Sequence, residues 1–267
     1  IENKVDFIAL SFVRQPEDIS KLKNYIREKN FNIPVISKIE RPEAIKNIDK
    51  IISVSDAVMV ARGDLGVEIS PEDIPSLQKM IIKKCNEACK PVITATQMLE
   101  SMISNPLPTR AETTDIANAI LDGTDCVMLS GETSVGAYPI ESVETMQRII
   151  IKTEEFQSAS PKNIYKEKFN TGNKLWHICR SAVDLADNLK ATAILTLTKS
   201  GKSPEIISHL RPHCPLIAAS ENRTILSQSK ILWGVLPIYI ERKNSLSEMT
   251  AEIKKSITGF EFLKKGD

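Results

Sequence analysis

Short apolar segments alternate with amphipathic segments over the first 156 residues of the chain. The apolar segments cover residues 5–12, 35–40, 57–61, 92–96 and 126–129. The amphipathic segments between them include residues 16–29, 71–88, 110–121 and 139–156. Apolar runs of this length suit strands, and the longer segments have the helical period. Strands that alternate with helices are parallel and joined by right-handed crossovers, so the pattern predicts an α/β fold.

The positions of polar residues distinguish a barrel from an open sheet. Each apolar segment ends in groups that are too polar for a core: Ser11 and Arg14, Lys38 and Glu40, Arg62 and Asp64, Thr94, Thr96 and Gln97, Ser130 and Glu132. Strand ends that converge on one site are typical of a (β/α)8 barrel, whose active site lies at the carboxyl ends of its strands. We therefore predict that residues 1–156 form part of such a TIM barrel, with about five of its eight strands.

The remainder of the chain predicts a second, smaller α/β domain. Residues 157–173 lose the apolar periodicity and are expected to be a linker. In residues 174–267, helices are expected at 174–189, 203–210, 222–229 and 246–257, and strands at 193–197, 215–219 and 235–240. The chain begins without a methionine, and its last residues resemble a turn before a further strand. We expect a fragment that is cut at both ends.

Charge and composition limit the classes of partner that the chain is expected to bind. The chain has 35 basic and 34 acidic residues, so it lacks the basic surplus that nucleic acid or an anionic membrane would require. No apolar run approaches the length of a membrane span, and the first residues do not resemble a signal peptide. Five cysteines, an odd number, suggest reduced thiols in a cytoplasmic protein. Small molecules and further subunits are the expected partners.

Lys38 and Glu40 are the most informative pair. Side chains alternate along a strand, so Lys38 and Glu40, which are two residues apart, point to the same side. Both lie near the carboxyl end of the expected strand. Placing an ammonium group and a carboxylate at a buried strand is costly unless they hold something charged, such as a metal ion or phosphate. The alternative for Lys38 is a surface lysine at a strand edge.

Asp64 lies between Gly63 and Gly66, which permit tight backbone geometry and expose N–H groups to an anion. With Glu40, its carboxylate could hold a divalent ion such as Mg2+ and leave positions for water and substrate. The alternative is a turn with a capping aspartate. Thr96 and Ser130 could donate protons or orient water, or only bond to nearby backbone.

A second candidate site follows the expected strand 193–197. Backbone N–H groups, hydroxyls and lysines at a helix N-terminus suit a phosphate, and they come here from Thr198, Lys199, Ser200, Gly201, Lys202 and Ser203. Position 196 is Thr where a nucleotide-binding P-loop requires glycine, so that motif fails. A phosphorylated effector site and a plain strand-to-helix turn both remain open.

Together, several segments resemble pyruvate kinases in order and spacing. They are residues 33–45 (IPVISKIERPEAI), 59–68 (MVARGDLGVE), 95–102 (ATQMLESM), 108–112 (PTRAE) and 128–133 (MLSGET). The resemblance implies barrel strands four to eight and an effector-binding C-terminal domain. It also implies transfer of phosphate from phosphoenolpyruvate to ADP, which gives pyruvate and ATP.

The resemblance also implies roles for individual residues. Glu40 and Asp64 would ligate Mg2+ or Mn2+, and Lys38 would neutralise the phosphoryl group in transit. The N–H groups of Gly63 and Asp64, with the Thr96 hydroxyl, would receive the substrate carboxylate. Thr96 and Ser130 would be candidates for the relay that protonates the enolate.

Further implications concern assembly and what this chain lacks. Arg110 would lie near the subunit interface of a homotetramer. The ligands of K+, of the substrate phosphate and of much of the nucleotide would lie in earlier strands and a lid domain, outside this chain. Val135 stands where some members carry a lysine. Two other hypotheses are a non-catalytic module that binds metal or a phosphorylated effector, and another barrel enzyme that acts on phosphoenolpyruvate or pyruvate.

Overall fold

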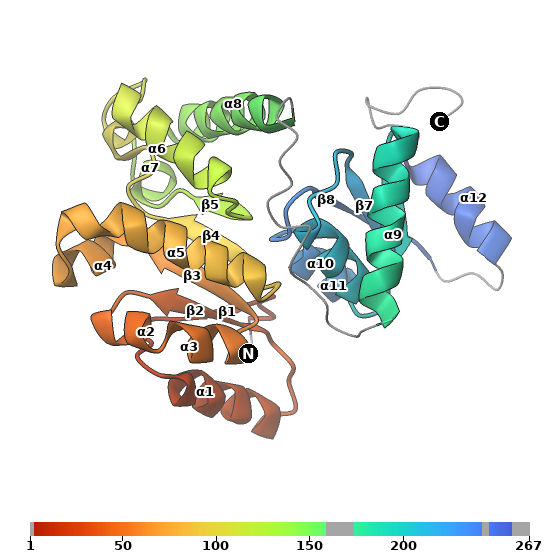
Figure 1. Ribbon diagram of the computed structural model, residues 1–267, viewed down its shortest axis with the longest axis horizontal. Coiled ribbons are helices and arrows are strands. Elements are labelled where there is room, and N and C mark those ends of the chain that lie inside the picture. Colours follow the sequence, from red (N-terminus) through yellow and green to blue (C-terminus); the bar gives the residue numbers. More distant parts are fainter. Residues whose placement is uncertain (1–2, 159–173, 242–245, 258–267) are drawn as a thin grey trace. The chain divides into compact units, whose positions relative to one another are not determined.

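The computed structural model describes residues 3–158, 174–241 and 246–257. The chain divides into two compact units, Ile1–Lys162 and Asn163–Asp267. Residues 159–173 of the expected linker lie outside the described residues. Each unit has its own parallel sheet and its own helices (Figure 1).

The first unit contains a sheet of five parallel strands in the order β1-β2-β3-β4-β5. The strands are β1 (Ile8–Leu10), β2 (Val35–Ile39), β3 (Ala57–Ala61), β4 (Val92–Ala95) and β5 (Cys126–Met128). Each strand pairs with the next along the chain, so the order has no reversal of the kind that defines a doubly wound sheet. A sequential parallel order is the arrangement of a barrel wall, as the sequence predicts.

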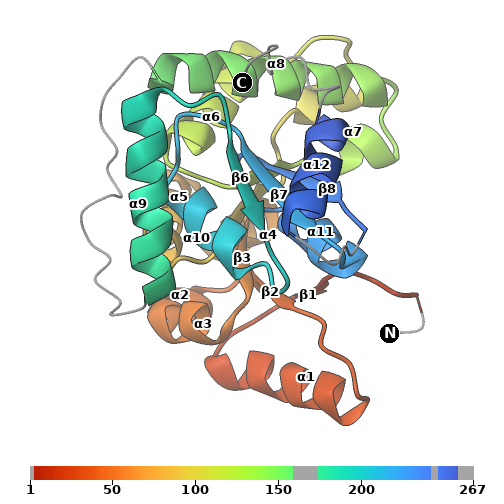
Figure 2. The same cartoon turned by 90° about the vertical axis from the view of Figure 1, so that its right-hand side faces the viewer.

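Helices connect these strands and follow one another in chain order, from α1 at one end of the unit to α8 at the other (Figures 1 and 2). They are α1 (Pro16–Glu28), α2 (Pro42–Lys46), α3 (Ile48–Val54), α4 (Arg62–Glu68), α5 (Ile74–Glu87), α6 (Arg110–Leu121), α7 (Gly131–Ser134) and α8 (Pro139–Ser158), with 3-10 turns η1 (Pro71–Asp73) and η2 (Glu100–Ile103). Proline occupies the first turn of α1, α2 and α5, where its missing N–H costs nothing.

The main core lies between the sheet and helices α1, α3 and α5. Alternate strand residues such as Val35, Ile39 and Val60 pack there with helix residues such as Ile51 and Ile81, all buried. Because side chains alternate along a strand, Lys38 and Glu40 belong to the opposite face. Burial of one face by helices therefore leaves the other face and its carboxyl edge for the site.

The expected elements agree with the structure except near the strand ends. Residues 62–68, for which the sequence predicts no helix, form helix α4. The expected helix 71–88 begins as the 3-10 turn η1 and becomes α5 only at Ile74. The expected strand 5–12 is shortened at both ends to β1. At its carboxyl end, Phe12 has a left-handed φ of 57°, which a strand does not accommodate.

The second unit has a three-stranded parallel sheet in the order β6-β7-β8. Its strands are β6 (Ile194–Leu197), β7 (Leu216–Ser220) and β8 (Val235–Tyr239), and its helices are α9 (Lys174–Leu189), α10 (Lys202–His209), α11 (Arg223–Ser229) and α12 (Leu246–Ile257). One sheet face packs against α9 and α10, for example at Val183 and Ile207. The other packs against Ile253 of α12. Helices on both faces are what parallel strands require.

Within the described residues, we find no helix that is both long and apolar enough to cross a membrane.

Candidate active site

The candidate residues of the first unit follow the carboxyl ends of four neighbouring strands. Ile39 of β2 pairs with Val60 of β3, and Ala61 of β3 pairs with Ala95 of β4. In a parallel sheet these ends lie along one edge. The edge therefore carries the four candidate residues that follow β2, β3, β4 and β5: Glu40, Asp64, Thr96 and Ser130.

Lys38 and Glu40 lie side by side, as strand alternation predicts. The ammonium nitrogen of Lys38 is 2.5 Å from Glu40 Oε1, and it also donates to the Ser11 hydroxyl at 3.0 Å. The other carboxylate oxygen, Oε2, accepts the Phe12 N–H at 2.7 Å. The Glu40 side chain is only 1% exposed, so its charge depends on these partners for stability. The pair joins the ends of β1 and β2.

Gly63 and Asp64 lie in the first turn of α4, which begins directly after β3. Neither Gly63 nor Gly66 has a left-handed φ, so the alternative of a glycine turn with a capping aspartate does not hold. A Cβ atom at Gly63 would lie 3.4 Å from Thr96 Oγ1, an ordinary van der Waals contact, which shows how closely Gly63 approaches Thr96. The Asp64 side chain is exposed. A helix that starts here still presents main-chain N–H groups toward the edge.

Thr96 follows β4 in an unusual backbone conformation. Its φ is +68°, and that of the next residue, Gln97, is +55°. The Thr96 hydroxyl donates to Ala95 O at 2.6 Å and accepts the Gly63 N–H at 2.8 Å. This contact brings the end of β4 against the start of α4, so Thr96 and Gly63 belong to one site.

Ser130 follows β5 and is held by the carboxylate of Glu132, a residue to which the sequence assigns no specific role. Glu132 is fully buried; its Oε2 accepts the Ser130 N–H at 2.7 Å and its Oε1 accepts the Leu99 N–H at 3.0 Å. Hydrogen bonds to backbone N–H groups offset the cost of burying the charge. Glu132 therefore ties the segment after β5 to the segment after β4. In the sequence, the only indication of this role was a single acidic residue after an expected strand.

Two polar residues grouped with the strand ends lie elsewhere. Thr94 is buried, and its hydroxyl donates to Thr124 at 3.0 Å. Strand alternation explains this result, because Thr94 shares its face of β4 with Val92, which packs in the core against the helices. Arg14 is exposed, and its N–H donates to Asp18 at the start of α1. Neither residue is therefore part of the candidate site.

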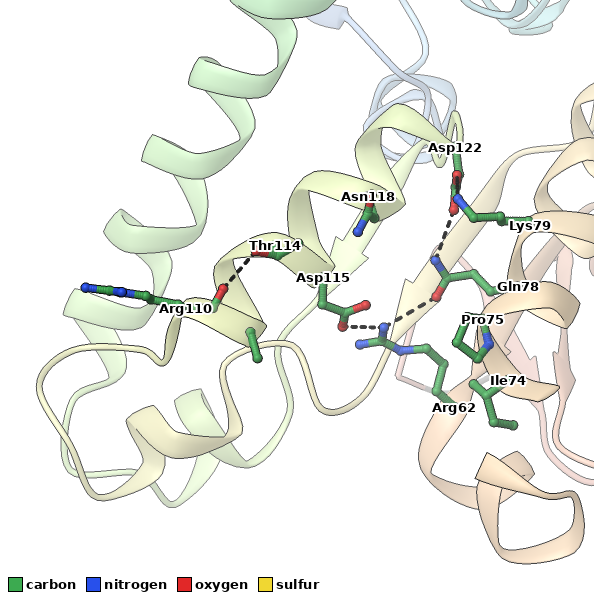
Figure 3. A pocket seen from close by; sticks show the side chains of 11 residues that line it. Arg62, Ile74, Pro75, Gln78, Lys79, Arg110, Thr114, Asp115, Asn118 and Asp122 are labelled. Carbon is green, nitrogen blue, oxygen red and sulfur yellow. Dashed lines mark hydrogen bonds and ion pairs between the residues drawn. The ribbon is translucent and has the colours of Figure 1, made fainter. Parts of the chain in front are cut away.

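Arg110, the expected interface residue, begins α6 and lines a cavity of about 510 Å³ between α5 and α6 (Figure 3). The cavity is also lined by Arg62 and by Asp115, whose carboxylate faces the Arg62 guanidinium. Lys38, Glu40 and Asp64 are not part of the cavity wall, which reaches the strand edge through Arg62.

The carboxylate of Glu112 is held in its charged form at the start of α6. Burial raises its pKa, but hydrogen bonds from Ser101 and from Thr109 outweigh burial and hold the pKa below the ordinary 4.5. Thr109 and Glu112 form a capping box there. The charged form of Glu112 thus stabilises the helix that carries Arg110.

The carboxylates at the strand edge fit a divalent ion that is completed by other ligands. Within the described ranges, no three or more His, Cys, Asp or Glu residues gather as a metal cluster. Glu40 and Asp64 offer two carboxylates on neighbouring strand ends, and Mg2+ commonly takes one or two carboxylates and fills its other positions with water and substrate oxygens. The donor set matches such a site.

In the second unit, the loop after β6 leads into α10. Gly201 is the N-cap of α10 and has a left-handed φ of +79°, a conformation that favours glycine. Its N–H donates to the Thr198 hydroxyl at 2.9 Å. Lys202 makes an ion pair with Glu205 at 2.9 Å, and both Lys199 and Lys202 are exposed. The loop is thus an ordered turn whose lysines face solvent.

Comparisons with known proteins match both units. Residues 1–143 match the family model "Pyruvate kinase, barrel domain", and residues 177–267 match "Pyruvate kinase, alpha/beta domain". The chain is 46% identical over 268 residues to a pyruvate kinase of Sporosarcina psychrophila and 43% identical over 270 residues to one of Geobacillus stearothermophilus. These matches cover 100% of this chain and 46% of each relative.

A comparison with solved structures matches the same family. The crystal structure of a pyruvate kinase from Cryptosporidium parvum superposes with a TM-score of 0.93 at 40% identity, and the match covers 99% of this chain and 55% of that one. The chain thus spans about half the length of the relatives it matches. The family models together cover most of the chain, and the matched barrel includes every strand end described above. The chain therefore belongs to the pyruvate kinase family.

Proposed function

We propose that this chain is part of an enzyme that transfers the phosphoryl group of phosphoenolpyruvate to ADP, which yields pyruvate and ATP. The observation that carries the proposal is the pair of Lys38 and the buried Glu40 at the carboxyl edge of β2, beside the first turn of α4. An ammonium group fixed next to a carboxylate can neutralise a phosphoryl group while the carboxylate holds a cation.

The residues divide the work by their chemistry. Glu40 and Asp64 would hold Mg2+ or Mn2+, which when bound supplies positive charge next to the phosphoryl oxygens. The Gly63 N–H donates to the Thr96 hydroxyl at 2.8 Å. A substrate carboxylate would take the place of this contact and accept from both groups, with the Asp64 N–H as a further donor. The ligands of K+ and of the nucleotide would come from the rest of the protein.

Transfer of the phosphoryl group leaves the enolate of pyruvate, which takes up a proton at its methylene carbon. Thr96 and Ser130 are the candidates for delivering this proton, directly or through water. Both side chains are half-buried at the same strand edge. Neither hydroxyl is acidic on its own, so each would pass on a proton received from solvent.

The second unit would bind a phosphorylated effector. The N-terminal turn of α10, with the hydroxyls and lysines of its loop, suits a phosphate group: Thr198, Lys199, Ser200, Gly201, Lys202 and Ser203. Arg110, exposed at the start of α6, would lie near an interface of a cytoplasmic homotetramer. These assignments rest on the family pattern and on the exposure of Lys199, Ser200, Lys202 and Arg110.

An assay of ADP-dependent pyruvate formation tests the proposal. The protein extended to family length should form pyruvate with Mg2+ and K+, and Lys38→Met should lower kcat by about a hundredfold or more, because an electrostatic stabiliser of the transition state is lost. Lys21→Met, at an exposed position of α1, is the control. A fully active 267-residue chain, or an unchanged kcat in Lys38→Met, would contradict the proposal.

A further inference from the structure

Arg62 is a buried cation in a position that the proposed chemistry does not use. It is the first residue of α4, only 7% exposed, and its guanidinium lies at the wall of the cavity between α5 and α6 (Figure 3). One nitrogen, Nη1, contacts Asp115 Oδ2 of α6 at 2.5 Å. A buried guanidinium requires such partners, because an unpaired charge there is strongly unfavourable.

The remaining nitrogens of Arg62 bind the main chain of the segment after β4. Nη2 donates to Thr96 O at 2.7 Å and to Gln97 O at 3.2 Å, and Nε donates to Thr96 O at 3.2 Å. The planar fork of a guanidinium suits two adjacent carbonyls, whereas a lysine ammonium would act only as a point charge.

The two carbonyls belong to consecutive left-handed residues. Thr96 and Gln97, neither of them glycine, have φ angles of +68° and +55°. A side chain at Cβ disfavours this conformation, and it persists only where the surroundings hold it. Arg62 binds the carbonyls of both residues, so the guanidinium stabilises the bend.

The same bend places the Thr96 hydroxyl. The residue after Arg62 is Gly63, whose N–H donates to Thr96 Oγ1 at 2.8 Å. Consecutive residues of α4 therefore hold Thr96 from two sides, through its carbonyl and through its hydroxyl. If the bend relaxed toward an ordinary φ, the hydroxyl would leave the α4 N-terminus.

We propose that Arg62, held by Asp115, is a positioning residue that keeps Thr96 in its left-handed conformation and so completes the binding site for the substrate carboxylate. The proposal rests on the proposed function for the role of Thr96 as a ligand. Arg62 itself touches no substrate, because it acts through the carbonyls of Thr96 and Gln97.

Kinetics of the full-length protein test the proposal. Arg62→Lys keeps the positive charge but loses the planar fork of the guanidinium. We expect the KM for phosphoenolpyruvate to rise about tenfold or more, because a small displacement of one binding group is costly. The KM for ADP should stay within about twofold of the parent. Asp115→Asn should raise the same KM by a smaller factor. A general structural defect would instead lower the amount of active enzyme and leave both KM values unchanged.

A glycine substitution tests whether Arg62 acts by holding the strained backbone of residues 96–97 or only by making a contact. Glycine adopts a positive φ without penalty, so Gln97→Gly in the Arg62→Lys background should recover at least half of the lost affinity, on a logarithmic scale. Lys79→Gln is the matched control: it removes an ion pair with Asp122 in the same cavity wall and does not touch residues 96–97, so its KM should equal that of the parent.

Three results would overturn the proposal: a KM for phosphoenolpyruvate within about twofold of the parent in both Arg62→Lys and Asp115→Asn, no recovery on adding Gln97→Gly, or a crystal structure of Arg62→Lys with both φ angles still left-handed. The crystal structure decides even if the parent forms no pyruvate. In that case the proposed function fails, while the bend of residues 96–97 is still tested directly. Should Arg62→Lys not fold, Asp115→Asn supplies both measurements.

Discussion

The ammonium group of Lys38 lies 2.5 Å from Oε1 of the buried Glu40 carboxylate, and the second oxygen of Glu40 accepts the Phe12 N–H. Two partners thus hold Glu40 in place from two strand ends. A fixed carboxylate loses little freedom when it binds a cation, which is the kind of preorganisation that ion sites use. Lys38 and Glu40 therefore depend on each other before any ligand arrives.

Removal of one negative charge from this edge should weaken metal binding. In the full-length protein, Glu40→Gln and Asp64→Asn should each raise the Mg2+ concentration that gives half-maximal activity by about tenfold or more, since metal sites are sensitive to their ligands. Titration of activity with Mg2+ measures this. Glu43→Gln, an exposed neighbour in α2, is the control. An unchanged Mg2+ requirement in both variants would show that the pairing of Glu40 with Asp64 is wrong.

The buried carboxylate of Glu132 should be needed for stability. Glu132→Gln turns an amide group toward two N–H donors, those of Leu99 and Ser130, so one acceptor is lost and a buried donor is left unsatisfied. We expect the free energy of unfolding to fall by about 1–3 kcal/mol. Chemical denaturation of the full-length protein measures it, and Glu144→Gln, an exposed change in α8, should have no effect. Equal stability of the two variants would contradict the role assigned to Glu132.

The loop before α10 should act on regulation and not on catalysis. Lys202→Ala should reduce activation by a phosphorylated effector while the basal rate stays within about twofold of the parent, because coupling between sites changes without a change at the strand edge. Dose–response curves with sugar phosphates and with AMP measure this. Lys230→Ala, an exposed lysine of the same unit, is the control. Loss of the basal rate in Lys202→Ala would place the loop in the active site instead.

The capping box of α6 should make stability depend on pH. The pKa of Glu112 is lowered, so its stabilising effect is fully present above the ordinary value of 4.5 and is lost as the pH falls below that value, when the folded protein must take up the proton. At pH 7, Glu112→Ala should lower the free energy of unfolding by about 0.5 kcal/mol, a cap contribution reduced by solvent exposure.

Thermal unfolding of parent and variant from neutral to acidic pH measures the difference. The two curves should converge as the pH falls below 4.5, and Glu144→Ala should follow the parent throughout. A difference that persists unchanged at the acidic end would mean that the charge of Glu112 contributes nothing to the cap.

Much of the candidate catalytic edge follows from the sequence alone. A period of two determines that Lys38 and Glu40 share a face, and the alternation of strands with helices determines that the ends after β2, β3, β4 and β5 meet at one edge. The order and spacing of short motifs likewise indicated the family that the comparisons establish. These features are local or periodic, so they can be read without knowing the fold.

The tertiary structure decided how that edge is held together. No local pattern indicated that Thr96 and Gln97 are left-handed or that residues 62–68 are helical. The left-handed pair is stabilised by Arg62, which is 34 residues from Thr96 and in turn contacts Asp115, 53 residues away. A strained backbone is maintained by partners that are distant along the chain, and those partners are brought together only when the sheet and its helices have packed.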